Sequence, residues 1–161
     1  MEKNILKGIL LTNILLLMIS CNSKQEASTT TAVDKEQIKK EIQAKEDEFA
    51  SVFNSGQLKD IGYYAEDATT FFQNREPLVG KQAIKDFLLA DVVANPNKIS
   101  FKTNEVFVSN DGNQVVEIGY FKVIDSTNNV INTGNYMTLF EKRNGKYVSV
   151  RDMSASDRPV E

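Results

Sequence analysis

The sequence contains no histidine and only one cysteine, Cys21, and both shortages exclude chemistry. Histidine is the most common general base and metal ligand in proteins, so histidine-dependent acid–base mechanisms and histidine metal sites are excluded. A single cysteine cannot form an intramolecular disulfide or a zinc–cysteine cluster. We therefore expect no cofactor and no bound metal.

A concentrated positive charge is also missing. The 19 lysines and arginines are scattered along the chain, and the 22 acidic residues leave a formal net charge of −3. Nucleic-acid-binding domains usually present a basic patch or stripe. We therefore expect no nucleic acid partner.

Long apolar runs are scarce, and the one that stands out is residues 9–19. Lys3 and Lys7 precede this run, and small Ser20 and then Cys21 follow it, which is the order of an export signal. The segment resembles a bacterial lipoprotein signal peptide, in which cleavage occurs just before a cysteine that already carries lipid. The resemblance implies removal of residues 1–20, lipid attachment at Cys21 and location at a membrane of the bacterial cell envelope, periplasmic or surface-exposed.

Two other interpretations of the apolar run are weaker. A membrane-spanning helix needs about 20 predominantly apolar residues, and Thr12 and Asn13 interrupt a run that is already shorter. A buried core helix is the second, but a basic N-terminus leading into an apolar run is unusual for one. Several acyl chains on one cysteine would hold the protein firmly to a membrane.

Residues 21–33 comprise the lipidated cysteine and a segment with almost no large apolar side chain, which predicts a flexible tether or a frayed terminus. The remaining residues, 34–158, have the length of one domain that can bury most of its apolar surface.

The sequence of this domain predicts helices followed by strands. Asp34 is a suitable cap for a helix that keeps Ile38, Ile42, Phe49 and Phe53 on one face and ends at residues 54–56. Further helices are predicted at 58–64 and 80–89, a strand at 68–72, and four longer strands at 98–108, 114–125, 129–142 and 146–155. Turn signals at 110–112, 128–129 and 144–145 separate the long strands. The pattern predicts an α+β domain with helices on one face of a curved, largely antiparallel sheet.

Residues 54–58, 64–69, 80–84 and 145–152, together with Asp157, resemble the nuclear transport factor 2-like superfamily, in particular its SnoaL-like branch. The resemblance implies a cone-shaped curved sheet wrapped around N-terminal helices, with an apolar pocket open at one end. It also implies a homodimer formed through the outer face of the sheet.

This fold does not decide function, because it hosts isomerases, dehydratases, cyclases, hydrolases and binding modules. Ketosteroid isomerase is the best-understood member, and the resemblance places its helix tyrosine at Phe49 and its base at Phe72. Its second aspartate falls near Met137 or Thr138. None of these side chains can act as the catalytic base or donate the strong hydrogen bond that the reaction requires. We therefore expect no ketosteroid isomerase chemistry and a pocket poor in proton-handling groups.

Asp152 is the one candidate catalytic carboxylate. Val148, Val150 and Asp152 alternate along a predicted strand, and the two valines indicate that this face is buried, whereas Arg151 faces the other way. Burial would raise the pKa of the Asp152 carboxyl toward the range useful for acid–base catalysis. The alternative is that Asp152 only accepts structural hydrogen bonds. Glu66 and Asp67 are predicted to face water.

The remaining candidate ligand-binding residues are aromatic. They suit either a pocket or a packed core, and alternation allows only one of Phe71 and Phe72 to face inward. The predicted ligand-binding residues are Phe49, Phe53, Tyr64, Phe72, Phe87, Tyr120, Tyr136 and Asp152.

The sequence thus predicts a membrane-anchored lipoprotein whose SnoaL-like domain binds a small, partly apolar ligand or a partner. One alternative is an enzyme of isomerase, hydratase or cyclase type that uses Asp152 with a tyrosine hydroxyl. Another is a dimeric interaction module whose pocket is filled by phenylalanines. An open volume of roughly 300 Å³ or more would contradict the filled pocket.

Overall fold

The computed structural model describes residues 33–58 and 61–159. The predicted signal peptide (1–20), the lipid attachment site Cys21 and the tether up to residue 32 lie outside the described residues and stay predictions. In the described part of the chain, no helix combines the length and apolar character needed to cross a membrane.

Helix α2 (Lys35–Asn54) matches the first predicted helix. The Asp34 side chain accepts a hydrogen bond from the backbone N–H of Gln37 at 3.0 Å, which caps the first turn. The chain leaves the helix through Gly56, whose φ of 69° is accessible to glycine at little cost. Ile38, Ile42, Phe49 and Phe53 are buried on one face, as their spacing predicts.

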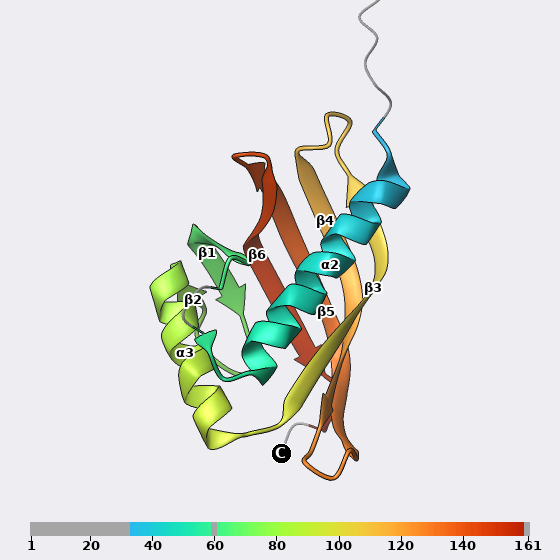
Figure 1. Cartoon of the computed structure of the whole chain (residues 1–161). Helices are drawn as coiled ribbons and strands as arrows, with labels where there is room; N and C mark the ends of the chain where they lie inside the picture. Colours follow the sequence, from blue (N-terminus) through green and yellow to red (C-terminus); the bar gives the residue numbers. More distant parts are fainter. Residues whose placement is uncertain (1–32, 59–60, 160–161) are drawn as a thin grey trace, which may run out of the picture. The chain divides into compact units, whose positions relative to one another are not determined.

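A six-stranded sheet follows, in the order β2-β1-β6-β5-β4-β3. All neighbours are antiparallel except β1 and β6, which are parallel. Figure 1 shows α2 lying across one face of the curved sheet and α3 (Lys81–Ala94) beside β1. The predicted α+β class is therefore confirmed. The strands are β1 (Tyr64–Phe71), β2 (Leu78–Val79), β3 (Lys98–Val108), β4 (Gln114–Ile124), β5 (Val130–Arg143) and β6 (Lys146–Ser156).

The predicted helix over 58–64 is wrong. Leu58 lies in a 3₁₀ turn, Gly62 and Tyr63 form a turn, and Tyr64 already belongs to β1. The backbone N–H of Ser149 in β6 donates to the carbonyl of Tyr63 at 2.7 Å. Pairing with a distant strand therefore overrides the local helical pattern here.

A β-bulge in β6 changes which residues face inward. Ser149 pairs with Phe140 and Arg151 pairs with Leu139, so Val150 is the extra residue. Val148 consequently faces away from the side that carries Asp152, contrary to the predicted alternation. Asp152 still faces inward, opposite Thr138. The prediction that Asp152 faces inward is therefore correct, but simple alternation with Val148 and Val150 is not the reason for it.

Side-chain amides of α2 form hydrogen bonds with the backbone groups at the free edge of β3. Asn54 donates to the carbonyl of Ile99 at 2.9 Å and accepts from its N–H at 2.8 Å. Gln43 likewise donates to the carbonyl of Phe101 at 3.3 Å and accepts from the N–H of Thr103 at 2.8 Å. Both amides thus replace a neighbouring strand, and they cover an edge that would otherwise be open to pairing with another chain.

Candidate functional site

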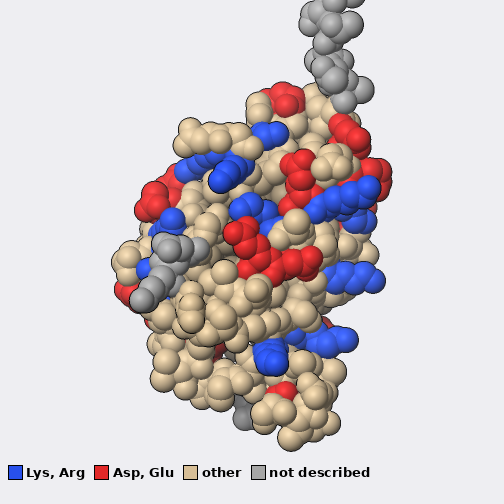
Figure 2. All heavy atoms as spheres, in the orientation of Figure 1, with Lys and Arg blue, Asp and Glu red and all other residues tan. Residues whose placement is uncertain are grey.

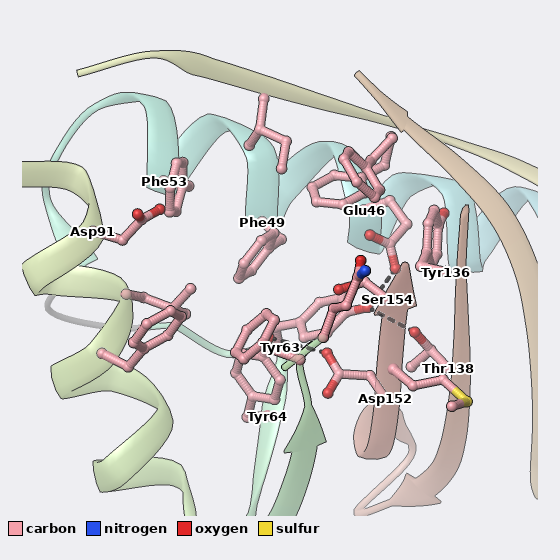
Figure 3. Close-up of a pocket in the computed structure, with 18 of the residues that line it drawn as sticks. Glu46, Phe49, Phe53, Tyr63, Tyr64, Asp91, Tyr136, Thr138, Asp152 and Ser154 are labelled. Carbon is pink, nitrogen blue, oxygen red and sulfur yellow. Dashed lines mark hydrogen bonds between the residues drawn. The ribbon is translucent and has the colours of Figure 1, made fainter. Parts of the chain in front are cut away.

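A cavity of about 400 Å³ lies between α2, α3 and the concave face of the sheet. Figure 3 shows side chains from both helices and from the strands pointing into this space. The volume is within the range of small-molecule sites. The phenylalanines therefore do not fill the pocket, which contradicts the filled-pocket interpretation.

Most of the predicted ligand-binding residues line the cavity, and whether they bind a ligand stays a prediction. The exception is Tyr120, which is 49% exposed. Its neighbours Gly119 and Phe121 pair with Tyr136 and Gly134 on the concave face, so Tyr120 points to the convex face. The seven that line the cavity are Phe49, Phe53, Tyr64, Phe72, Phe87, Tyr136 and Asp152.

Phe71 and Phe72, at the end of β1, point to opposite faces of the sheet, as predicted. Phe72 lines the cavity, whereas Phe71 is 41% exposed on the convex face beside Met153. The ring of Phe72 packs against that of Phe87 in α3, with 4.9 Å between ring centroids. The guanidinium of Arg75 lies 4.0 Å from the centroid of Phe87, which is a cation–π contact among the cavity residues.

Phe49 is the centre of the aromatic wall. Its ring centroid lies 4.9 Å from that of Tyr63, 5.6 Å from Phe101, 6.0 Å from Tyr64 and 6.2 Å from Phe53. Tilted and edge-to-face contacts at these separations are favourable for aromatic pairs. The wall is therefore a packed, preformed apolar surface.

Glu46 lies one helical turn before Phe49 and is only 1% exposed. Its Oε1 accepts a hydrogen bond from the Tyr63 hydroxyl at 2.5 Å, and that hydroxyl lies 3.5 Å from the Thr138 hydroxyl. Burial raises the pKa of the Glu46 carboxyl well above its usual value, and the charge of Glu117 raises it further. The Glu46 carboxyl therefore holds its proton more tightly than an exposed glutamate does.

Asp152, on β6, forms a second carboxyl site in the cavity. Its oxygens accept hydrogen bonds from the Thr70 hydroxyl and, at 3.3 Å, from the Tyr64 hydroxyl. Burial raises the pKa of Asp152 to about 6, although the two hydroxyls act in the opposite direction. At neutral pH this carboxyl is mostly ionised.

Glu117 lies behind the cavity wall and is fully buried. Its Oε1 accepts from the Thr103 hydroxyl at 2.5 Å and from the Tyr136 hydroxyl at 2.8 Å. Its Oε2 is also buried. Burial raises the pKa of Glu117, and hydrogen bonds with these two hydroxyls and with the Glu46 carboxyl lower it.

The expectation of a pocket poor in proton-handling groups is therefore wrong. The positions compared with ketosteroid isomerase are indeed inert, since Phe49, Phe72 and Thr138 line the cavity and Met137 is on the convex face. Other positions supply the acids instead. Glu46 had a sequence signal, because it falls on the apolar face of its helix, four residues after Ile42.

The other acidic candidates lie outside the cavity. Glu66 accepts from Lys81 at 3.0 Å, and Asp67 pairs with Arg143 at 2.5 Å, with both acids exposed as predicted. Within residues 33–58 and 61–159, no group of three or more histidine, cysteine or acidic side chains could hold a metal ion. Figure 2 shows acidic and basic side chains interspersed on the face that carries α2.

No family model matches the sequence, and none of the curated proteins is similar to it. Several solved structures are similar in fold. A protein with a cystatin-like fold from Nostoc punctiforme is 14% identical, with a TM-score of 0.65 over 76% of this chain and 92% of that one. A ketosteroid isomerase-like protein from Erwinia carotovora atroseptica is 17% identical, with a TM-score of 0.60 over 74% of this chain and 96% of that one.

An NTF2-like protein with a cystatin-like fold from Novosphingobium aromaticivorans is 14% identical, with a TM-score of 0.62 over 78% of this chain and 85% of that one. At these identities the similarity establishes the fold and not the activity. The described domain therefore has the cystatin-like, nuclear transport factor 2-like fold that the SnoaL-like resemblance predicts.

Proposed function

We propose that the domain binds a small, partly apolar molecule in the cavity between α2, α3 and the sheet. The observation that carries the proposal is an open space of about 400 Å³ with an aromatic wall and hydrogen-bonded carboxyl groups. The apolar part of the ligand would pack against Phe49, Phe53 and Phe101. Its polar group would contact Glu46 or Asp152, because a few polar groups in an apolar pocket fix ligand orientation.

Filling the cavity tests this proposal. Ser154 is a small residue that lines it, so Ser154→Phe should reduce the space available to a ligand. Ala155→Phe is the matched control, because Ala155 is the exposed neighbour on the other face. The melting temperature of each protein is measured with a collection of small apolar metabolites, since a ligand that binds only the folded state raises it.

Compounds that stabilise the unaltered protein and the control, but not Ser154→Phe, would support the cavity as the binding site. Equal stabilisation of all three proteins would contradict it. A complete lack of stabilising compounds would favour an interaction module over a ligand-binding domain.

A second candidate function is acid–base catalysis of isomerase, hydratase or cyclase type. It is favoured by the pKa of about 6 for Asp152 and by the hydrogen bond that Tyr64 donates to it. A carboxyl with such a pKa exchanges protons readily near neutral pH. Asp152→Asn should abolish turnover of a substrate while the protein stays folded, and unchanged turnover would remove Asp152 from the mechanism.

We also propose that the mature protein is a lipoprotein anchored through Cys21. The support is the sequence alone, in which an apolar run after two lysines ends at the single cysteine. Cys21→Ala should move the protein from the membrane fraction to the soluble fraction of its host. Retention of Cys21→Ala in the membrane fraction would refute lipid anchoring.

A homodimer through the convex face is a further proposal. Ile118, Met137, Met153 and Phe71 pair in register across four strands, and the last three are 43%, 53% and 41% exposed. A continuous apolar row of this kind marks an interaction surface, and a two-fold axis would bring it against its own copy. Met137→Glu should shift the mass measured by light scattering from dimer to monomer. A monomeric unaltered protein would contradict the proposal.

A further inference from the structure

The charges that line the cavity are unbalanced. Among the residues that the structure describes, its lining includes three acidic residues, Glu46, Asp91 and Asp152, and one basic residue, Arg75. Figure 3 shows Asp91 on α3 beside Phe53, on the opposite side of the view from Glu46 and Asp152. The guanidinium of Arg75 lies over the ring of Phe87 in α3. This basic residue of the lining is therefore at the same wall of the cavity as Asp91.

Among residues 33–58 and 61–159, no lysine or arginine forms a salt bridge with Asp152. Both of its hydrogen bonds come from neutral hydroxyls, those of Thr70 and Tyr64. None of the salt bridges among the described residues involves Asp152 or Glu46. A buried carboxylate without a compensating positive charge is costly, and a cation that enters the cavity would relieve that cost.

The surroundings of Asp152 suit a cation in a second way. The rings of Phe49, Tyr63 and Tyr64 pack together beside it, with centroids 4.9 to 6.0 Å apart. The faces of aromatic rings attract ammonium groups when these are removed from water.

We propose that the ligand of this cavity is a monocationic amine with an apolar body, whose ammonium group pairs with the Asp152 carboxylate. This inference rests on the proposed ligand-binding function and specifies its ligand class. A carboxylate ligand is disfavoured because it would place a second negative charge beside Asp152. A neutral ligand would leave the charge of Asp152 uncompensated.

The proposal predicts how binding depends on pH. The ammonium group pairs with the ionised form of Asp152, and protons compete for that form as the pH falls through about 6. Affinity for the amine should therefore be about tenfold lower at about pH 5 than at about pH 7. Glu46 also lines the cavity, and burial and the charge of Glu117 raise the pKa of its carboxyl well above its usual value. The other titratable or charged groups around the cavity and its wall are Tyr63, Tyr64, Arg75, Asp91, Glu117 and Tyr136.

Three matched probes test the inference: phenylbutylamine, phenylbutanol and phenylbutyrate. Each is titrated into the protein while backbone amide signals are followed by NMR, which detects binding at millimolar concentrations. The amine should bind at least about tenfold more tightly than the alcohol, and the carboxylate should bind most weakly. Asp152→Asn should reduce amine affinity to the level of the alcohol and remove its pH dependence.

Asp157→Asn is the matched control, because Asp157 also accepts a hydrogen bond from a threonine hydroxyl but is exposed and outside this cavity. Equal affinities for amine and alcohol would overturn the cation inference while leaving the binding function intact. Binding of none of the three probes would overturn both. The pH titration uses the unaltered protein, so the test does not depend on the folding of Asp152→Asn.

Discussion

The buried carboxyl of Asp152 should make the protein less stable as the pH rises. Its pKa is about 6 in the folded state against 3.8 for the ordinary side chain, so the folded state binds this proton more tightly than the unfolded state does. Stability is then lost as the pH rises from about 3.8 to about 6 and changes little above that. At 1.36 kcal/mol per pKa unit, the loss from this one group is about 3 kcal/mol.

Asp152→Asn removes the ionisation and with it this pH dependence. The asparagine carbonyl can replace only one of the two carboxylate oxygens that accept hydrogen bonds from the Thr70 and Tyr64 hydroxyls. A lost hydrogen bond costs about 1 kcal/mol. The variant should therefore be less stable than the unaltered protein by about 1 kcal/mol near pH 4. It should be more stable by about 2 kcal/mol near pH 7, because the ionisation cost exceeds the lost hydrogen bond.

Urea denaturation of both proteins, at several pH values between these limits, measures the two free energies of unfolding. The decisive observation is a change of sign in their difference within the interval from about 3.8 to about 6. A variant that is destabilised by the same amount at every pH would refute the reasoning. Asp152 would then be a structural hydrogen-bond acceptor and not a buried charge that destabilises the folded state.

Other features of the fold allow further predictions. A Cβ added to Gly119 would overlap the ring of Tyr136, so Gly119→Ala should lower the free energy of unfolding in urea by about 1–3 kcal/mol. Gly62→Ala, where a Cβ meets no neighbour within 4 Å, is the control, and equal effects of both would contradict the contact. Replacing Gln43 and Asn54 together by alanine should expose the edge of β3 and increase aggregation measured by light scattering. Unchanged scattering would show that the two amides do not protect that edge.

The buried carboxyl groups in and behind the cavity wall are informative about function, because burying a carboxyl without a basic partner is costly. Replacing Glu46 or Glu117 by an apolar residue of similar size would remove a buried acid that has no basic partner among the described salt bridges. Perturbed carboxyls of this kind gather at functional sites, where they contact a ligand or exchange a proton. Their position beside an open cavity links them to the proposed binding site.

Local sequence signals were sufficient for most of the elements. The Asp34 cap and Gly56 define the ends of α2, and the turns at 110–112, 128–129 and 144–145 separate strands whose bounds agree with the predicted ones within two residues. At those turns Gly112, Asn128, Asn144 and Gly145 have positive φ, which these residue types tolerate. Such signals work because they depend on the residue itself and its near neighbours.

The tertiary structure decided which of the acidic side chains meet at the cavity. Glu46, Glu117 and Asp152 come from one helix and two separate strands, and only folding brings them together with Tyr63 and Tyr136. The bulge at Val150 shifts the alternation of β6, and pairing with β6 draws Tyr63 out of a predicted helix. Burial and long-range pairing set both outcomes, and neither is encoded in the spacing of residues along the chain.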